Sequence, residues 1–281
     1  MKHHNLAGIS IGGSSPVRIM GVINLSPESF FKDSVPLNKR SLMDIAKKME
    51  DEGADFIDLG AQSTAPYLET HISEEEEERR LLWGIEAIRR TTSIPLSIDT
   101  SRARPAKMAL EAGATILNDI TGLNGDRKIL PLLPKFRGLV LMAHPSGLSR
   151  KIQKDPVRTV KGCLKKTIAL AVKSGASSLR MAIDPGIGFF RKTGMPWWKW
   201  DIKILSDLHE FSSLKIPILA GVSRKSFIGE ILHQKNPNDR LAGSLAAATI
   251  AVMNGASIIR THDVKVTFEA VRLAEKLRSL S

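Results

Sequence analysis

Polar side chains recur where short apolar runs of the chain come to an end. Asp99, Asn118 and Asp184 each close one such run, and Arg260 and His262 close another. A single Asp after a strand is most often a helix cap or a turn residue. The same pattern at six of the eight predicted strands indicates instead that these side chains meet. Parallel strands of a barrel all end on one face, and that face carries the active site.

Four of these residues suit recognition of a flat polar heterocycle. Asp99, Asn118, Asp184 and Lys225 combine two carboxylates, an amide and an ammonium group. Together they offer both donors and acceptors. Lys225 alone also fits a Schiff-base lysine, because burial can lower a lysine pKa. Its Ser-Arg-Lys-Ser context favours anion binding equally, so both interpretations stay open.

The remaining polar strand ends suit an anion and a metal ion. Arg260 and His262 offer cationic or donor groups to a phosphate, and Asn24 offers a hard oxygen ligand for Mg²⁺. A lone histidine is most often a structural residue, but a place beside Arg260 at a strand end favours a functional role for His262.

The elements that must position these residues alternate along the chain. Short β-branched runs predict strands at 17–24, 56–60, 95–99, 115–119, 138–142, 178–184, 216–221 and 257–260. Amphipathic stretches predict helices at 39–52, 74–90, 104–112, 126–132, 157–174, 202–211, 241–254 and 264–280. Eight such βα units in 281 residues predict one α/β fold, a single (β/α)8 TIM barrel over residues 17–281 with a short N-terminal extension at 1–16.

Composition restricts the class of protein further. The 42% apolar and 25% charged residues are typical of a globular chain, and no apolar run is long enough to span a membrane. The net charge of +12 favours a small anionic ligand over nucleic acid, because the basic residues are dispersed and no nucleic-acid module is recognisable. The single Cys163 and the absence of a signal peptide predict a cytoplasmic protein. The tryptophan-rich segment 195–200 is expected to pack between helices or at a subunit interface.

Seven motifs occur in an order that resembles the dihydropteroate synthase family. They are MGVINLSPESF at 20–30, DLGAQST at 58–64, SIDT at 97–100, NDI at 118–120, DPGIGF at 184–189, SRKSFIG at 223–229 and RTHDV at 260–264. The resemblance implies an enzyme that joins 6-hydroxymethyl-7,8-dihydropterin diphosphate to p-aminobenzoate and releases pyrophosphate with Mg²⁺. In this family the reaction is dissociative and passes through a pterin-methyl cation. The family also implies a homodimer.

The resemblance also assigns roles to residues of this chain. Pterin binding falls to Asp99, Asn118, Met142, Asp184 and Lys225. Diphosphate binding falls to Asn24, Arg260 and His262, with Mg²⁺ on Asn24, and arylamine binding to Thr64, Pro66, Phe189 and Ser226, with Lys225 beside them. The residues expected to act in catalysis are Lys225, Asp99 and Asp184.

The chain departs from the family pattern at two places. The family has a diphosphate-binding arginine in the loop after the second strand, where this chain has Ala65. Losing such a contact costs about 1.5 to 3 kcal/mol unless Lys32, Arg191 or Lys192 replaces it. The family's histidine directly follows the methionine of the fifth strand. Here Ala143 intervenes, so no role is carried over to His144.

Other functions compete with this one. A methyltetrahydropterin:corrinoid methyltransferase shares the barrel and similar pterin-binding residues, but it needs no residues that bind a diphosphate. A non-catalytic pterin-binding protein is a further alternative, motivated by Ala65. Because the departing loop helps to define the arylamine site, a ribofuranosyl-aminobenzene phosphate is an alternative acceptor.

Overall fold

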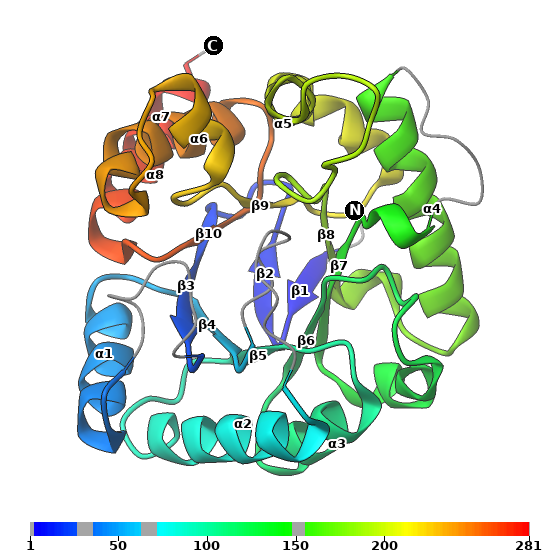
Figure 1. Ribbon diagram of the computed structural model, residues 1–281, viewed down its shortest axis with the longest axis vertical. Coiled ribbons are helices and arrows are strands. Elements are labelled where there is room, and N and C mark those ends of the chain that lie inside the picture. The colour runs from blue at the N-terminus through cyan, green and yellow to red at the C-terminus, as the bar shows by residue number, and fades with distance from the viewer. Residues whose placement is uncertain (1–2, 27–35, 63–71, 148–154, 281) are drawn as a thin grey trace.

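A ring of parallel strands surrounded by helices forms the molecule (Figure 1). The computed structural model describes residues 3–26, 36–62, 72–147 and 155–280. The strands are β3 (Arg18–Asn24), β4 (Phe56–Gly60), β5 (Leu96–Asp99), β6 (Ile116–Asp119), β7 (Gly138–Met142), β8 (Met181–Asp184), β9 (Leu219–Gly221) and β10 (Ile258–Thr261). Their order around the ring is β8-β7-β6-β5-β4-β3-β10-β9, and a parallel bridge between Ile183 and Ile218 joins its two ends. The predicted (β/α)8 barrel is thereby confirmed.

The helices cover the outside of this ring. They are α1 (Lys39–Asp51), α2 (Glu74–Ile88), α3 (Ala103–Glu111), α4 (Pro156–Lys173), α5 (Trp197–Ser206), α6 (Ser226–Ile231), α7 (Leu241–Met253) and α8 (Val264–Arg278). Side-chain caps define several of their starts. Asn38 accepts from the Ser41 N–H, and Ser73 accepts from the Glu76 N–H. Each cap satisfies a backbone donor that the first helical turn leaves without a partner.

Some predicted elements were wrong in type or extent. The expected helix at 126–132 is a 3₁₀ segment, η2 (Arg127–Lys135), because Pro131 and Pro134 lack the N–H that an α-helix needs. The expected strand at 178–184 begins with a 3₁₀ turn, η4 (Ser178–Arg180), before β8. The helix expected at 202–211 begins earlier, at Trp197, and ends at Ser206 before a 3₁₀ segment, η5 (Leu208–Leu214). The sequence did not predict α6.

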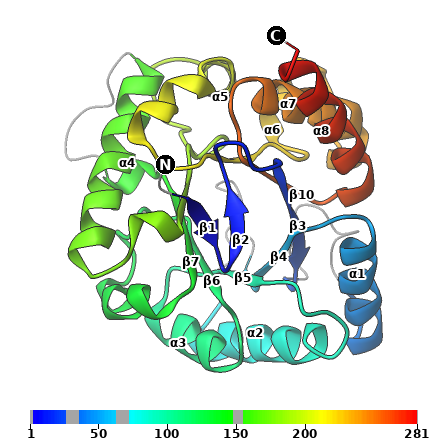
Figure 2. The same ribbon diagram turned by 180° about the vertical axis from the view of Figure 1, so that it is seen from behind.

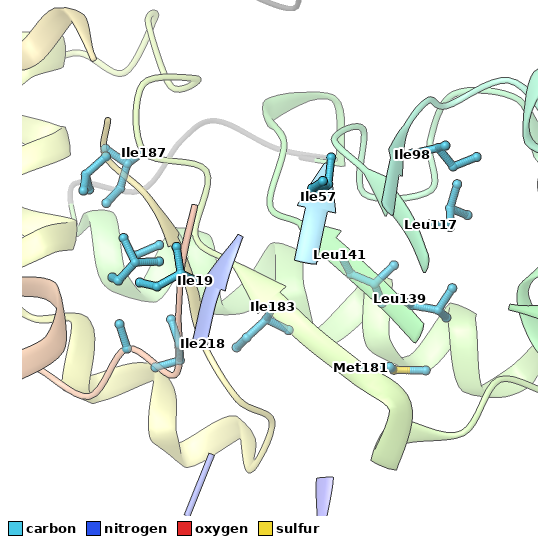
Figure 3. Close-up of a cluster of buried hydrophobic side chains, with 14 of the residues drawn as sticks. Ile19, Ile57, Ile98, Leu117, Leu139, Leu141, Met181, Ile183, Ile187 and Ile218 are labelled. Atoms are coloured by element: carbon cyan, nitrogen blue, oxygen red, sulfur yellow. The ribbon is translucent and has the colours of Figure 1, made fainter. Parts of the chain in front are cut away.

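Successive side chains of each strand point alternately outward and inward, and they form two separate hydrophobic cores. Residues such as Ile57, Leu141 and Ile183 point outward into the layer between strands and helices, and Figure 3 shows these side chains in one buried cluster. The next residues along the strands point into the ring. Their apolar members form the inner cluster with Met20, Phe56, Ile116, Val140, Ala182, Leu219 and Ile258. Because the side-chain period of a strand is two, the polar residues at the same parity also face the interior.

The N-terminal residues form an antiparallel hairpin of β1 (His4–Leu6) and β2 (Ile9–Ile11). Both views show the hairpin inside the ring of strands (Figure 2). Leu6 and Ile11 join the inner cluster. A Cβ on Gly138 would lie 2.6 Å from Leu6 Cδ1, so the glycine makes room for the hairpin. The division between an extension at 1–16 and a barrel at 17–281 stays a prediction.

Membrane insertion through a helix finds no support in the described ranges. None of the helices there combines the length and the apolar character that crossing a bilayer requires.

Candidate active site

The polar side chains expected at strand ends point into the barrel, because each lies an even number of residues from an inward-facing residue of the same strand. In the strand register Asn24 is paired with Gly60, Gly60 with Asp99, and Asp99 with Asn118. On the opposite side Met142 is paired with Asp184. These residues therefore form a polar layer above the inner apolar cluster, at the carboxyl ends of the strands.

Asp58 lies at the centre of this layer and organises it. Its Oδ2 accepts from Arg260 Nε over 2.7 Å and from Asn118 Nδ2 over 3.0 Å. Arg260 Nη2 is also 3.5 Å from Asp99 Oδ2. The Asp58 side chain is completely buried, so the guanidinium supplies the charge that its burial requires.

Two buried carboxylate oxygens of the layer find no hydrogen-bond partner among the described residues. Asp58 Oδ1 and Asp99 Oδ1 accept no hydrogen bond within the described part of the chain. Burial and the neighbouring Asp58 raise the pKa of Asp99. Buried acceptors of this kind carry a desolvation cost that a donor from a ligand would offset. The layer is thus suited to a heterocycle that presents N–H groups.

Asp184 faces the same space from β8. Its Oδ1 accepts from the Gly186 N–H over 2.8 Å, at the start of the loop that follows the strand. A Cβ on Gly221 would lie 3.8 Å from Asp184 Oδ2. Burial raises the pKa of Asp184, although Lys225 and Arg260 oppose the shift.

Lys225 closes the polar layer from the loop after β9. Its Nζ lies 4.7 Å from the centroid of the Phe189 ring, a cation–π distance. Gly188 lies against its stem, since a Cβ there would be 3.3 Å from Lys225 Cδ. Burial lowers the pKa of Lys225 to about 8, although Asp184 favours the charged form. A lysine held in this way can donate hydrogen bonds to a ligand on the Asp184 side.

A concentration of cations marks the other side of the mouth. His262 Nδ1 is 3.0 Å from Ser223 Oγ, which fixes the orientation of the ring. Burial, together with Arg260, Arg224 and Lys225, lowers the pKa of His262 to about 3. The imidazole is therefore neutral, and one ring nitrogen carries a proton. Cations that disfavour a further positive charge favour an anion at the same place.

Arg224 has a structural role in this region. It forms two contacts with Asp263, of 2.7 and 2.9 Å, and donates to the carbonyls of Pro237 and Asn238. The buried guanidinium thus ties the loop after β9 to the end of β10. This pair holds Lys225 and His262, which flank it in sequence, in fixed positions.

Asn24 offers one oxygen ligand near the mouth. The side chain is half-buried, and its Oδ1 would lie 3.8 Å from a Cβ on Gly60. Across the described ranges, His, Cys, Asp and Glu side chains form no group of three that could hold a metal by themselves. Mg²⁺ commonly takes one or two protein ligands together with substrate phosphates and water. Asn24 fits that kind of site.

The residues expected around the arylamine are only partly described. Phe189 and Ser226 lie next to Lys225, whereas Thr64 and Pro66 lie outside the described residues, as do Lys32 and Ala65.

The structure brings His144 to the same mouth. Its ring meets the Phe189 ring edge-on at 6.3 Å. His144 follows Met142 by two residues, and side chains two residues apart in extended chain point to the same side. With Ala143 between them, the histidine therefore faces the inside of the barrel, as Met142 does.

Known proteins with similar sequences identify the family of this chain. The family model described as "Pterin binding enzyme" matches residues 20–262. A dihydropteroate synthase of Synechocystis sp. is 35% identical over 92% of this chain and 89% of its own length. The chain belongs to the dihydropteroate synthase family of pterin-binding enzymes. The family resemblance in the sequence is thereby confirmed, and with it the assignment of the chain to the transferases of folate biosynthesis.

Other members of the synthase family agree in sequence and in structure. The dihydropteroate synthase of Escherichia coli K12 is 35% identical over 95% of this chain and 94% of its own. The structure of the Coxiella burnetii synthase in complex with pteroic acid has 37% identity, full coverage of both chains and a TM-score of 0.86. The Xanthomonas albilineans synthase with 4-aminobenzoic acid has 31% identity and a TM-score of 0.86 over 100% of this chain and 99% of its own.

Sequence reasoning did not assign a role to Asp58, although it lies inside a family motif. The available signal was a carboxylate in the middle of the otherwise apolar run 56–60. Its parity places it inside the barrel, where an ionised group requires a counterion. The residue that supplies the counterion, Arg260, lies at the opposite end of the chain.

Proposed function

We propose that this chain condenses 6-hydroxymethyl-7,8-dihydropterin diphosphate with p-aminobenzoate and releases pyrophosphate. The observation that carries the proposal is the arrangement of the barrel mouth. Asp99, Asn118 and Asp184 offer acceptors and a donor to a heterocycle, Arg260 and His262 offer donors to an anion, and Lys225 interacts with both Asp184 and Arg260. This arrangement matches a substrate with a polar heterocycle at one end and a diphosphate at the other.

The pterin occupies the layer formed by Asp99, Asn118, Met142, Asp184 and Lys225. The Oδ1 atom of Asp99 is a buried acceptor with no donor among the described residues, and the pterin ring supplies N–H donors to such atoms. Lys225 donates to acceptors of the same ring. Met142 shares the inward parity and gives the heterocycle an apolar contact.

The diphosphate lies toward Arg260, His262 and Asn24. As the C–O bond to the leaving group breaks, negative charge accumulates on pyrophosphate, so a cation there stabilises the transition state more than the ground state. Positive charge develops on the pterin methylene at the same time, and Asp99 and Asp184 favour it. The amine then forms the C–N bond and loses one proton.

Asn24 supplies an oxygen ligand to Mg²⁺ in this proposal. The ion, when bound with the substrate diphosphate, neutralises charge on the leaving group. Phe189 and Ser226, with Thr64 and Pro66, border the arylamine. An acceptor larger than p-aminobenzoate, such as a ribofuranosyl-aminobenzene phosphate, is the alternative that the same assay distinguishes.

Two further proposals concern the state of the protein. Exposed apolar side chains gather on adjacent helices, with Ile250 and Met253 on α7 and Leu273 and Leu277 on α8. We infer a homodimer through this face, since burial of such side chains favours association. A cytoplasmic location is inferred from the use of a single cysteine, Cys163, which forms no disulfide.

The test is pyrophosphate release from dihydropterin diphosphate with Mg²⁺, measured without amine, with p-aminobenzoate and with ribofuranosyl-aminobenzene phosphate. Amine-dependent release, a pteroate product identified by mass and loss of both in Lys225→Ala are expected. Lys107→Ala, which removes an exposed cation from the outer helix α3, is the matched control and should retain activity. Pterin binding without release would contradict the proposal and favour a binding protein, whereas methyl transfer to a corrinoid would favour the methyltransferase.

A further inference from the structure

The tryptophan-rich segment at the start of α5 places its indoles in different surroundings. Trp200 is buried and stacks on Phe190, with ring centroids 5.3 Å apart. Trp197 is half-buried and carries the guanidinium of Arg191 on its face, with 4.0 Å between Arg191 Cζ and the ring centroid. The expected helix packing thus accounts for Trp200. Trp197 packs against the same core but also carries a cation on its ring, and this contact calls for a separate explanation.

Arg191 is held at three points beside the mouth of the barrel. Its Nε donates to the Gly188 carbonyl over 2.9 Å, its Nη2 contacts Ser226 Oγ, and its plane lies on Trp197. The side chain has therefore already lost most of its rotamer freedom, which lowers the entropic cost of binding a ligand. Gly188 and Ser226 are the immediate neighbours of Phe189 and Lys225. The Arg191 guanidinium therefore lies near Lys225, and the two charges interact.

From this geometry we propose that Arg191 binds the anionic group that the arylamine carries opposite its amine, and that Trp197 positions the guanidinium. The inference rests on the proposed function. The amine must reach the pterin methylene, which lies deeper, near Asp184 and Lys225. A carboxylate at the para position then points out of the barrel, toward the loops that carry Arg191 and Ser226.

Ser226 completes this subsite. Its Oγ accepts from Arg191, so its own proton can be donated to another acceptor. A carboxylate with two oxygens is thereby offered one charged and one neutral donor. We thus assign Arg191 to the arylamine. The sequence had suggested another role for it, as a replacement for the family's diphosphate-binding arginine.

The inference is tested by comparing two acceptors that differ only in charge, p-aminobenzoate and p-aminobenzamide. Arg191→Met keeps the aliphatic stem and removes the guanidinium. It should raise the KM for p-aminobenzoate by about 10- to 100-fold, the range for a lost charged hydrogen bond, and leave the KM for p-aminobenzamide within about twofold. Arg191→Lys should fall between the wild type and Arg191→Met. The KM for dihydropterin diphosphate should stay unchanged in each variant.

Trp197→Leu tests the positioning role, and Lys107→Met on the outer helix α3 is the control for a change in overall charge. Trp197→Leu should raise the KM for p-aminobenzoate by about 3- to 10-fold with kcat unchanged, because the cation–π contact is weaker than the carboxylate contact. Lys107→Met should leave the KM for both acceptors unchanged. Equal effects of Arg191→Met on both acceptors, or none on either, would overturn this inference and leave the proposed function standing. Absence of turnover in the wild type would overturn both.

Discussion

Arg260 and Asp58 form an ion pair in the centre of the barrel, 2.7 Å apart and 202 residues apart in the chain. One comes from β10 and the other from β4, with β3 between them. The pair therefore joins the last barrel strand of the chain to the second one across β3, and it also places the cation of the proposed diphosphate site.

Replacement of Asp58 by Asn should leave Arg260 buried without its closest counterion. We expect the free energy of unfolding to fall by about 3 to 5 kcal/mol, the range for breaking a buried pair. The KM for dihydropterin diphosphate should also rise, because Arg260 is no longer held. Urea unfolding and steady-state kinetics measure the two effects. Glu86→Ala removes a carboxylate that pairs with Lys39 on the exposed surface and should alter neither. Unchanged stability of Asp58→Asn would mean that Asp99 alone balances the guanidinium.

The activity should decline on the alkaline side as Lys225 loses its proton. Burial lowers its pKa to about 8, so the ammonium is present below that pH and is lost above it. We expect kcat/KM for dihydropterin diphosphate to fall as the pH rises through 8.

Lys225→Arg is the decisive variant for this profile. Its guanidinium stays charged, so the alkaline decline should move to higher pH. The maximal rate should drop, because Gly188 and Phe189 pack against the lysine stem. An alkaline decline at the same pH in Lys225→Arg would show that another group titrates.

Gly188 and Gly194 offer a matched pair of alanine substitutions in one loop. Both have positive φ angles, 91° and 79°, so each alanine should cost stability by about 1 to 2 kcal/mol. A Cβ at Gly188 would lie 3.4 Å from Lys225 Nζ, whereas one at Gly194 would meet no atom of the described residues within 4 Å.

Only Gly188→Ala should therefore impair catalysis. Displacement of the lysine should lower kcat/KM by about tenfold or more, while Gly194→Ala should remain near the wild-type value. Urea unfolding and kinetics on both variants give the comparison. Equal kinetics in the two variants would argue that the position of Lys225 tolerates this shift.

The barrel and most of its polar layer follow from local patterns. The apolar runs predict the strands, and parity within a run decides which side chains face inward, as for Asp99 and Asn118. The pairing of Asp58 with Arg260 could not be predicted in this way, because it depends on how distant strands meet. The position of Arg191 likewise depends on a stacking contact with Trp197 across a loop.

The other errors have physical causes that lie outside strand periodicity. Pro131 and Pro134 convert an amphipathic stretch into a 3₁₀ segment, although its apolar spacing resembles that of an α-helix. The hairpin of β1 and β2 is too short to give a strong pattern, and the inner cluster that it contacts stabilises it.

That hairpin has a consequence for the order of folding. Leu6 packs against Gly138, and β1 also contacts β8, so its docking waits for strands that come much later in the chain. Closing so long a loop costs conformational entropy, and the contacts that compensate for this cost form only once the loop is closed. We therefore expect the hairpin to dock inside the barrel in one of the last folding steps, after β7 and β8 have formed. Amide exchange during refolding should then show protection at Leu6 later than at the Val140 backbone.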